Sequence, residues 1–174
     1  MAKQNSLRDY QASILERIES VKNAYDMTSA GYLGVVIGDK NVLVDLKEIT
    51  ETLAMVEIHP IPLVKPWFLG VSNVRGVLYA INDMAQLMDN KPTKPSSSSR
   101  LLLIGESVAA NVAFLVDRLI GLRSLNALKK HDEEVQDSIC LKAETYKDEE
   151  NRVWHVLDCV KLVQSKAFAT PYAT

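Results

Sequence analysis

Cysteine and histidine are scarce in this sequence. Two cysteines, Cys140 and Cys159, occur in 174 residues. They permit at most one disulfide, which excludes a disulfide scaffold and favours a reducing compartment. Each lies in or beside an apolar strand pattern, which predicts a buried, inert thiol. The three histidines lie far apart, and none has a second ligand at metal spacing, so the sequence predicts no metal site. They are His59, His131 and His155.

The sequence also lacks an excess of positive charge and is poor in aromatic residues. Its 20 basic and 22 acidic side chains give a net charge of −2, and aromatic residues make up 6%. This composition disfavours nucleic-acid binding, which needs a basic surface and stacking aromatics. Charged residues interrupt the most apolar region, 101–122, and the first residues have no signal-peptide pattern. We therefore expect a cytoplasmic protein with no direct membrane insertion.

Motifs of catalysis and cofactor binding are missing too. The glycines have neither dinucleotide nor phosphate-loop spacing. Residues 105–109 resemble a nucleophile elbow for three positions but end in Ala109 and lie in an expected hairpin. The acidic runs at 132–134 and 148–150 lie in charged loops with no apolar setting. We predict no catalytic residue and no cofactor, and hence a binding module.

The most regular pattern present is an amphipathic helix over residues 6–25. Its apolar side chains recur at steps of three and four residues, and charged residues fall between them. Asn5 or Ser6 can cap it. Two interpretations stay open: the stripe packs on the rest of the domain, or it binds a partner or a second copy. The stripe consists of Leu7, Tyr10, Ile14, Leu15, Ile18, Val21 and Tyr25.

After Gly31 the pattern changes to short apolar runs separated by turn residues, which is typical of small barrels or a sandwich. A polar, low-complexity linker covers residues 90–99. Charged loops are expected at 129–137 and 147–152. The expected strands are 32–37, 42–46, 53–58, 68–73, 77–81, 100–104, 111–116, 122–125, 139–143 and 153–157.

The two halves of the chain resemble each other. The run 37–39 is echoed by 104–106, and the run 43–45 by 115–117. Later, an apolar strand ends at Asp83 and another at Asp158, each followed four residues on by a leucine. Each of these aspartates can cap a short helix. The echo predicts a duplication: two small barrels joined near residues 90–99.

Residues 64–76 hold the most information. Trp67 supplies anchoring area, and Gly70 relieves crowding in a strand. Asn73 and Gly76 suit a turn that visits positive φ, which holds Arg75 near a hairpin tip. No carboxylate lies within three residues of Arg75, so its partner lies elsewhere. A distant loop and another protein are both open as that partner.

The pattern Gly70-x-x-Asn73-x-Arg75-Gly76, followed by a strand that ends in Asp83, resembles the signature of CheW-like domains. These are coupling proteins of bacterial chemosensory arrays, and the resemblance covers roughly residues 30–165. It implies a mainly β fold of two five-stranded SH3-like barrels related by a pseudo-two-fold axis, with short capping helices. The fuller match over residues 64–76, and an N-terminal extension, are similar to the twitching-motility (PilI-type) branch, which serves type IV pili.

The resemblance implies a division of the chain and a set of partners. Residues 1–30 would form a helical extension and 31–174 the CheW-like domain, with barrels near 31–90 and 100–165 and possible strand exchange between them. The family bridges a CheA-type histidine kinase, through its regulatory domain, to the cytoplasmic tip of a methyl-accepting receptor. We therefore expect recruitment to membrane-anchored receptor arrays. The alternatives are a non-catalytic binding module of another pathway and a single-stranded nucleic-acid binder.

Six residues carry the implied partner contacts. By resemblance, Arg75, Asn73 and Gly76 would lie at the receptor-binding groove, and Glu51 at a partner contact. An apolar patch for the kinase would include the remaining two, Ile49 and Leu53. The sequence departs from the family at Ala80, where proline is usual, and at Asn82, where an apolar residue is usual. The glycine-rich lead-in to the last strand pair is also replaced, by residues 141–144.

Overall fold

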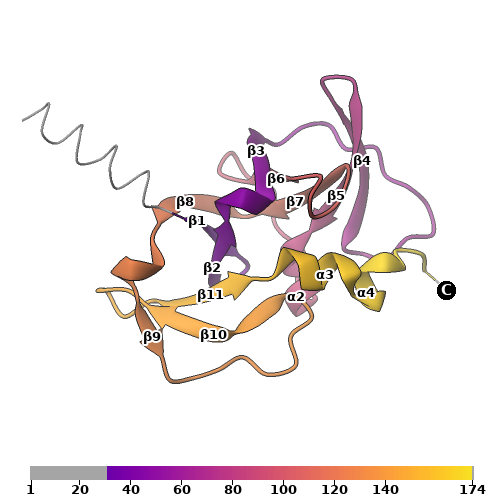
Figure 1. The fold of residues 1–174 in the computed structure, drawn as a ribbon. Helices are drawn as coiled ribbons and strands as arrows, with labels where there is room; N and C mark the ends of the chain where they lie inside the picture. Colours follow the sequence, from indigo (N-terminus) through magenta and orange to yellow (C-terminus); the bar gives the residue numbers. More distant parts are fainter. Residues whose placement is uncertain (1–30, 174) are drawn as a thin grey trace, which may run out of the picture. The chain divides into compact units, whose positions relative to one another are not determined.

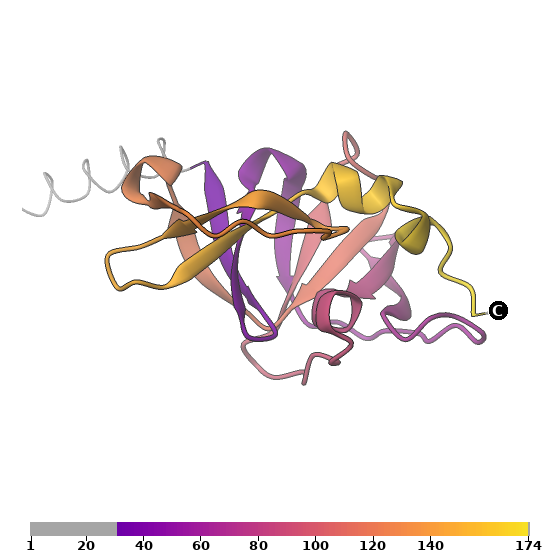
Figure 2. The same ribbon diagram turned by 90° about the horizontal axis from the view of Figure 1, so that it is seen from below.

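The computed structural model describes residues 31–173, and the predicted helix over residues 6–25 lies outside them. The fold is mainly β and consists of two sheets that lie side by side (Figures 1 and 2). This confirms the predicted fold class. The first sheet has six strands in the order β8 (Arg118–Arg123), β1 (Tyr32–Ile37), β2 (Lys40–Asp45), β11 (Val153–Leu157), β10 (Leu141–Lys147) and β9 (Lys129–His131).

The second sheet has five strands, and short helices follow the strands of both sheets. Its order is β3 (Ile49–Ala54), β6 (Arg100–Ile104), β7 (Val112–Val116), β5 (Val77–Asp83) and β4 (Phe68–Val74). The α-helices are α2 (Met84–Asp89), α3 (Cys159–Gln164) and α4 (Lys166–Ala169), and the 3-10 turns are η1 (Leu46–Glu48) and η2 (Leu125–Ala127). No helix among residues 31–173 is long and apolar enough to cross a membrane.

The sheet orders reveal the duplication that the sequence echo predicts. The orders β8-β1-β2-β11-β10 and β3-β6-β7-β5-β4 can be aligned position by position. At each position, the two strands are equivalent and come from different halves of the chain. Both sheets contain one parallel pair at the same place, β2 with β11 and β7 with β5. The hairpin β1–β2 of the first half therefore lies in the sheet formed by the strands of the second half. The hairpin β6–β7 of the second half lies in the sheet formed by the other strands of the first half. The linker at 90–99 therefore does not separate two contiguous barrels.

Several expected strand limits need correction. The third strand is β3, at Ile49–Ala54 rather than 53–58, because η1 turns the chain directly into it. The strand expected at 122–125 begins earlier, as β8, and the one at 139–143 continues to Lys147 as β10. The expected charged loop at 129–137 begins with β9, whose lysines are exposed on an edge strand. Edge strands in soluble proteins often carry lysine, which hides them from a search for apolar runs.

Between the sheets lies a core built by the exchanged hairpins. Alternate residues of each hairpin enter it in equivalent positions, such as Ile37 with Ile104 and Val44 with Val116. Leu43 and Leu115, which directly precede Val44 and Val116, point instead into the separate cores of the first and second sheets, respectively. These strands are buried on both faces, which is why they read as unbroken apolar runs rather than alternating ones.

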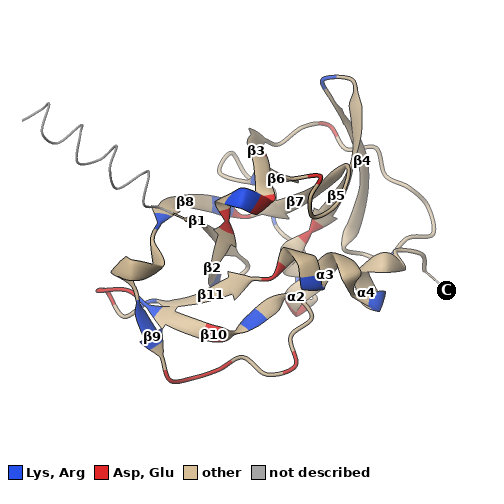
Figure 3. Cartoon of the chain, viewed as in Figure 1, with Lys and Arg blue, Asp and Glu red and all other residues tan. Residues whose placement is uncertain are grey.

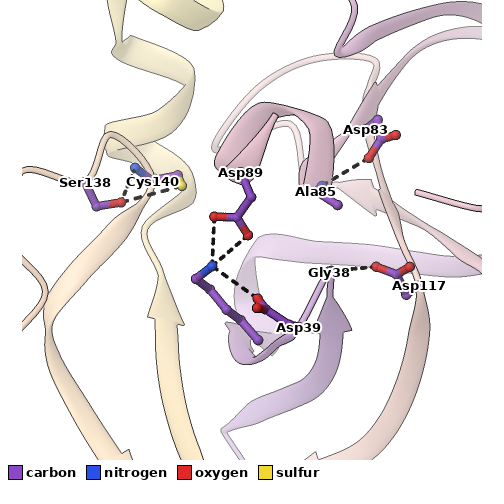
Figure 4. Close-up of polar contacts among 9 residues, drawn as sticks. Gly38, Asp39, Asp83, Ala85, Asp89, Asp117, Ser138 and Cys140 are labelled. Atoms are coloured by element: carbon purple, nitrogen blue, oxygen red, sulfur yellow. Dashed lines mark hydrogen bonds and ion pairs between the residues drawn. The ribbon is translucent and has the colours of Figure 1, made fainter. Parts of the chain in front are cut away.

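Polar contacts fix the exchanged hairpin β1–β2 both to the second half of the chain and to helix α2 of its own half. The backbone N–H of Gly38 donates to Asp117 Oδ2 at 2.7 Å (Figure 4). Lys40 Nζ donates to both oxygens of Asp89, at 2.8 and 2.6 Å. Asp89 is the last residue of α2, so this ion pair joins the first sheet to the helix that follows the second. Both groups are about a quarter exposed (28% and 27%), so solvent screens the pair only partly.

The two cysteines are free and buried, as the sequence predicts. Burial raises the pKa of the Cys140 thiol and, more strongly, that of Cys159. A thiol with a raised pKa carries little thiolate, which is the reactive form. Cys159 begins α3 inside the inter-sheet core. Both residues therefore act as small apolar packing groups.

Asp83 and Asp158 cap helices α2 and α3, as the repeated pattern predicts, but their surroundings differ. Asp83 is 1% exposed, and its carboxylate accepts from Ala85 N, Gln86 N, and both Thr93 N and Thr93 Oγ1. Asp158 is half-buried, and among residues 31–173 it accepts only from Lys161 N. Asp83 thus also anchors the start of the 90–99 linker, through buried Thr93.

We predict that Asp83→Ala and Asp158→Ala differ in cost although both remove a helix cap. Loss of a cap alone costs about 1 kcal/mol, and this is the effect expected for Asp158→Ala. Asp83→Ala also leaves the buried Thr93 donors without an acceptor, so we expect about 2–4 kcal/mol in total. Urea unfolding monitored by circular dichroism measures both values. Equal losses would contradict the anchoring role of Asp83.

Candidate functional site

The arm formed by β4 and β5 ends in a two-residue turn at Arg75 and Gly76. Val74 pairs with Val77 across the turn, and the two turn residues have φ values of +51° and +87°. Positive φ at both central positions is the geometry that matches the twist of a hairpin. Glycine adopts it freely, whereas arginine does so at a cost. Backbone strain of this kind is concentrated at functional sites, which marks the arm tip as a candidate.

Asn73 holds the turn from the side. Its Oδ1 accepts a hydrogen bond of 2.8 Å from the backbone N–H of Gly76. Asn73 itself stays in the strand, paired with Leu78. The predicted positive φ is therefore found at Gly76 and Arg75, and Asn73 contributes its side chain instead. Asn73, Arg75 and Gly76, three of the four signature residues, thus take part in one turn.

Arg75 pairs with Glu51, which lies in β3. The two guanidinium nitrogens donate to the two carboxylate oxygens at 2.7 and 2.6 Å, a bidentate pair. The side chains are 71% and 34% exposed. The hydrogen bond from Arg75 lowers the pKa of Glu51. The two residues, which were predicted separately from the sequence, thus form one ion pair. Glu51 is the distant carboxylate partner that the sequence around Arg75 does not provide.

Gly70 is required at the base of the arm. The segment before β4 pairs antiparallel with this strand at one position, where His59 exchanges backbone hydrogen bonds with Val71 at 2.8 and 2.9 Å. A Cβ on Gly70 would lie 2.2 Å from the carbonyl oxygen of His59, and Gly70 has φ +136°. Only glycine fits a strand position that another backbone approaches so closely.

The two apolar residues predicted to form one patch lie against different cores. Ile49 packs on the inter-sheet core and Leu53 on the core of the second sheet, with a register shift between Ile49 and Glu51. Both are half-buried. The more exposed apolar residues near the arm tip are Val77 and Leu78, at 42% and 55%. These two residues could not be predicted as exposed, because alternation in a strand does not show which face meets solvent.

Charges over the described part of the chain are mixed rather than gathered. Figure 3 shows basic and acidic segments interspersed over both sheets. Among residues 31–173, no three histidine, cysteine or acidic side chains lie together as metal ligands would. The distinctive polar feature of the second sheet is thus the exposed Arg75–Glu51 pair at the strained turn.

The comparison with protein families agrees with this geometry. The model of the CheW-like domain matches residues 31–167, which is most of the chain. The chain belongs to the CheW-like domain family. No curated protein matches it in sequence.

Among solved structures, the CheW-like fold is similar to that of the scaffolding protein TtCheW from Thermoanaerobacter tengcongensis. The TM-score is 0.66 with 14% sequence identity, over 80% of this chain and 95% of that one. At this identity the likeness concerns the fold. The arrangement of two sheets is thus shared, while most side chains differ.

We predict that Gly70→Ala is far more damaging than Gly76→Ala. At Gly70 the added methyl meets a backbone oxygen that cannot move without breaking the His59–Val71 pairing, so we expect a loss of about 3 kcal/mol or more. At Gly76 the added methyl would meet no other atom of residues 31–173 within 4 Å beyond its chain neighbours, and only the left-handed backbone is strained, at about 1–2 kcal/mol. Thermal unfolding of both variants tests this. A larger loss of stability for Gly76→Ala would refute the close pairing with His59 as the reason for glycine at position 70.

We predict that Arg75→Ala returns the pKa of Glu51 toward the ordinary glutamate range. In the native protein the pair favours the charged carboxylate, so its small stabilisation is present above the unfolded pKa and is lost as the pH falls through the lowered value. Carboxyl NMR titration measures the shift. Glu144 is a matched control, since its pKa is lowered by Lys130 and should not respond. An unchanged pKa of Glu51 in the Arg75→Ala variant would mean that Arg75 does not lower it.

Proposed function

We propose that the protein is a chemosensory scaffold that couples a methyl-accepting receptor to a CheA-type histidine kinase. The observation that carries the proposal is the Arg75–Glu51 pair, held on a strained turn at the tip of the β4–β5 arm. It is exposed and contributes little to stability, so its placement is better explained by binding than by folding. Membership of the CheW-like family and the likeness to a scaffolding protein support the same role.

The arm would meet the receptor with charge and apolar area together. Arg75 and Glu51 offer a rigid bidentate pair whose free edges can exchange hydrogen bonds with a partner. Val77 and Leu78, next to them in the chain, supply exposed apolar surface. Asn73 and Gly76 keep the turn in shape. Fully formed before binding, such a tip loses little conformational entropy on association.

The kinase would bind a different part of the second sheet. Ile49 and Leu53 are candidates because each is half-buried on β3 and retains some accessible surface. No chemical step is involved: contacts that favour one kinase conformation shift its population. Weak contacts suffice in an array, because many copies raise the effective concentration. A role in type IV pilus twitching motility, at membrane-anchored receptor arrays, belongs to this proposal.

We predict that Arg75→Glu weakens binding to a receptor cytoplasmic fragment by at least about tenfold, or 1.4 kcal/mol, and leaves folding intact. Two glutamates would then face each other at the arm tip, and the cation would be lost. Titration of the full chain with the receptor fragment, and separately with the kinase regulatory domain, measures both affinities. Kinase binding should stay within twofold.

Arg118→Glu is the matched control, because Arg118 is an exposed cation of the first sheet, away from the arm. It should bind the receptor fragment like the native protein. The charge exchange Glu51→Arg with Arg75→Glu distinguishes a structural pair from a direct contact. Restored binding would show that the pair only shapes the tip. Native affinity in Arg75→Glu itself would refute the arm as the receptor site.

A further inference from the structure

His155 lies in β11 with one ring nitrogen buried and unpaired. The side chain as a whole is half-buried. Its Nδ1 is one of two buried side-chain nitrogen or oxygen atoms among residues 31–173 that have no hydrogen-bond partner. Such atoms are uncommon, because burial removes a polar group from water without replacing the lost hydrogen bond. A proton on this nitrogen would therefore find no acceptor in place.

Strand pairing directs His155 toward the core between the sheets. It pairs with Val42 of the parallel strand β2 and with Thr145 of the antiparallel strand β10. Directly paired residues place their side chains on the same face of a sheet. Val42 belongs to the inter-sheet core, and Lys40, two residues before it, lies on the same face. Thr145 is 2% exposed, and its hydroxyl donates to the backbone oxygen of Glu133. The neighbours of His155 within the sheet are thus an apolar side chain and a hydroxyl that already has a partner.

The charges that act on His155 belong to the contact that holds hairpin β1–β2 on α2. Lys40 Nζ donates to both oxygens of Asp89, at 2.8 and 2.6 Å, and to Asp39 Oδ1 at 3.4 Å (Figure 4). Burial lowers the pKa of His155, and the charge of Lys40 lowers it further, while Asp89 and Asp39 oppose the shift. The folded protein therefore favours the neutral ring, and the positive charge in this cluster belongs to Lys40.

A cavity beside this ion pair adds one carboxylate and one thiol. Its volume is about 320 Å³, and Lys40, Asp89, Asp137 and Cys140 are among its lining residues. Asp137 is exposed, so solvent screens its charge. Burial raises the pKa of the Cys140 thiol, which therefore stays neutral. Neither group has a hydrogen bond to His155 within residues 31–173, so neither compensates a charge on the ring.

The next histidine in the same row differs from His155 because its ring has partners. His131 of β9 pairs with Thr145 on the other side of β10. Its Nδ1 accepts a hydrogen bond of 3.3 Å from the backbone N–H of Glu133, and its Nε2 lies 3.6 Å from Glu133 Oε2. His131 is therefore a natural control for effects that depend on the unpaired nitrogen of His155.

The duplication shows how the same position is satisfied in the other half of the chain. Val42 is equivalent to Phe114, which pairs with Asn82 in the parallel strands β7 and β5. The amide of Asn82 donates to two backbone carbonyl oxygens, at 3.1 and 3.2 Å. Asn82 cannot gain a proton, whereas His155 can. At this position, only the hairpin β1–β2 therefore has a titratable neighbour.

We propose that His155 makes the attachment of hairpin β1–β2 to α2 sensitive to protons. When the ring gains a proton, a second cation lies on the face that carries Lys40, and its Nδ1–H has no acceptor unless a carboxylate turns away from Lys40. Either outcome weakens the contact between Lys40 and Asp89. Because this contact joins the first sheet to the helix that follows the second, acidification loosens the exchanged hairpin.

The sign of the effect follows from the neutral ring of the folded state. The unfolded chain has a histidine of ordinary pKa, which binds a proton more readily than His155 does in the folded protein. The stability that neutral His155 contributes is therefore present above the unfolded pKa and is lost as the pH falls through the lowered value. Acidification from about pH 7.5 to about pH 5.5 enters this range while most carboxylates stay ionised.

The first test is an NMR titration of the His155 ring in the full chain. Lys40→Met removes the cation and should raise the pKa of His155, whereas Asp89→Asn removes an opposing carboxylate and should lower it. Shifts of opposite sign in the two variants would show that the ring responds to this ion pair. No shift in either variant, or shifts in the same direction, would overturn the proposal.

The second test measures amide hydrogen exchange of the full chain, expressed as protection relative to the unfolded rate at each pH. Acidification over the same range should reduce the protection of hairpin β1–β2 more than that of the equivalent hairpin β6–β7. His155→Gln keeps a polar side chain that cannot titrate, and it should remove this difference.

His131→Gln is the matched control and should retain the difference between the two hairpins. Equal losses of protection in both hairpins of the native protein, or an undiminished loss in His155→Gln, would refute the proposal. Arg75→Glu should respond to acidification like the native protein, so the result is independent of the receptor role proposed for the arm.

Discussion

The fold depends on the exchange of two hairpins across the pseudo-two-fold axis. Because β1–β2 and β6–β7 each complete the sheet of the other half, neither sheet can form from one contiguous half of the chain. The exchange creates a shared core in which Val42 and Phe114, like Ile37 and Ile104, occupy equivalent positions. Each exchanged strand is buried on both faces, so it contributes to two cores at once. The unit over residues 31–173 is therefore cooperative by construction.

Because the exchanged strands are buried in the shared core, the outer strands of the second sheet are free for binding. β4 is an edge strand. Its first half is covered by the antiparallel pairing with His59, while its second half continues into the turn at Arg75. The covered half is rigid and apolar, and the free half is exposed and charged. One hairpin thus carries two chemically different surfaces: a bidentate ion pair at its tip and an apolar groove at its base.

Sequence reasoning succeeded where a residue type has one structural explanation. Asp83 and Asp158 could be assigned as helix caps, and Gly76 as a turn residue, because capping and positive φ restrict the choice of residue. The fold class followed from the echo between the halves and from the family signature. The exchange of hairpins was open only as a possibility implied by the resemblance, since an apolar run buried on two faces has the same pattern in either sheet. Strand β9 was missed because Lys129 and Lys130 carry no apolar signal.

The contacts within the candidate site could not be predicted from the sequence either. Arg75 and Glu51 were each proposed from a resemblance, yet no spacing rule relates two residues on strands that are not neighbours in the sheet. Their pairing depends on how far the arm projects beyond β3, which only the three-dimensional structure defines. Ile49 and Leu53 were expected in one patch from the resemblance, but they lie on either side of the register shift after Ile49 and pack against different cores. Partner binding on this scaffold is therefore governed by strand register as much as by residue identity.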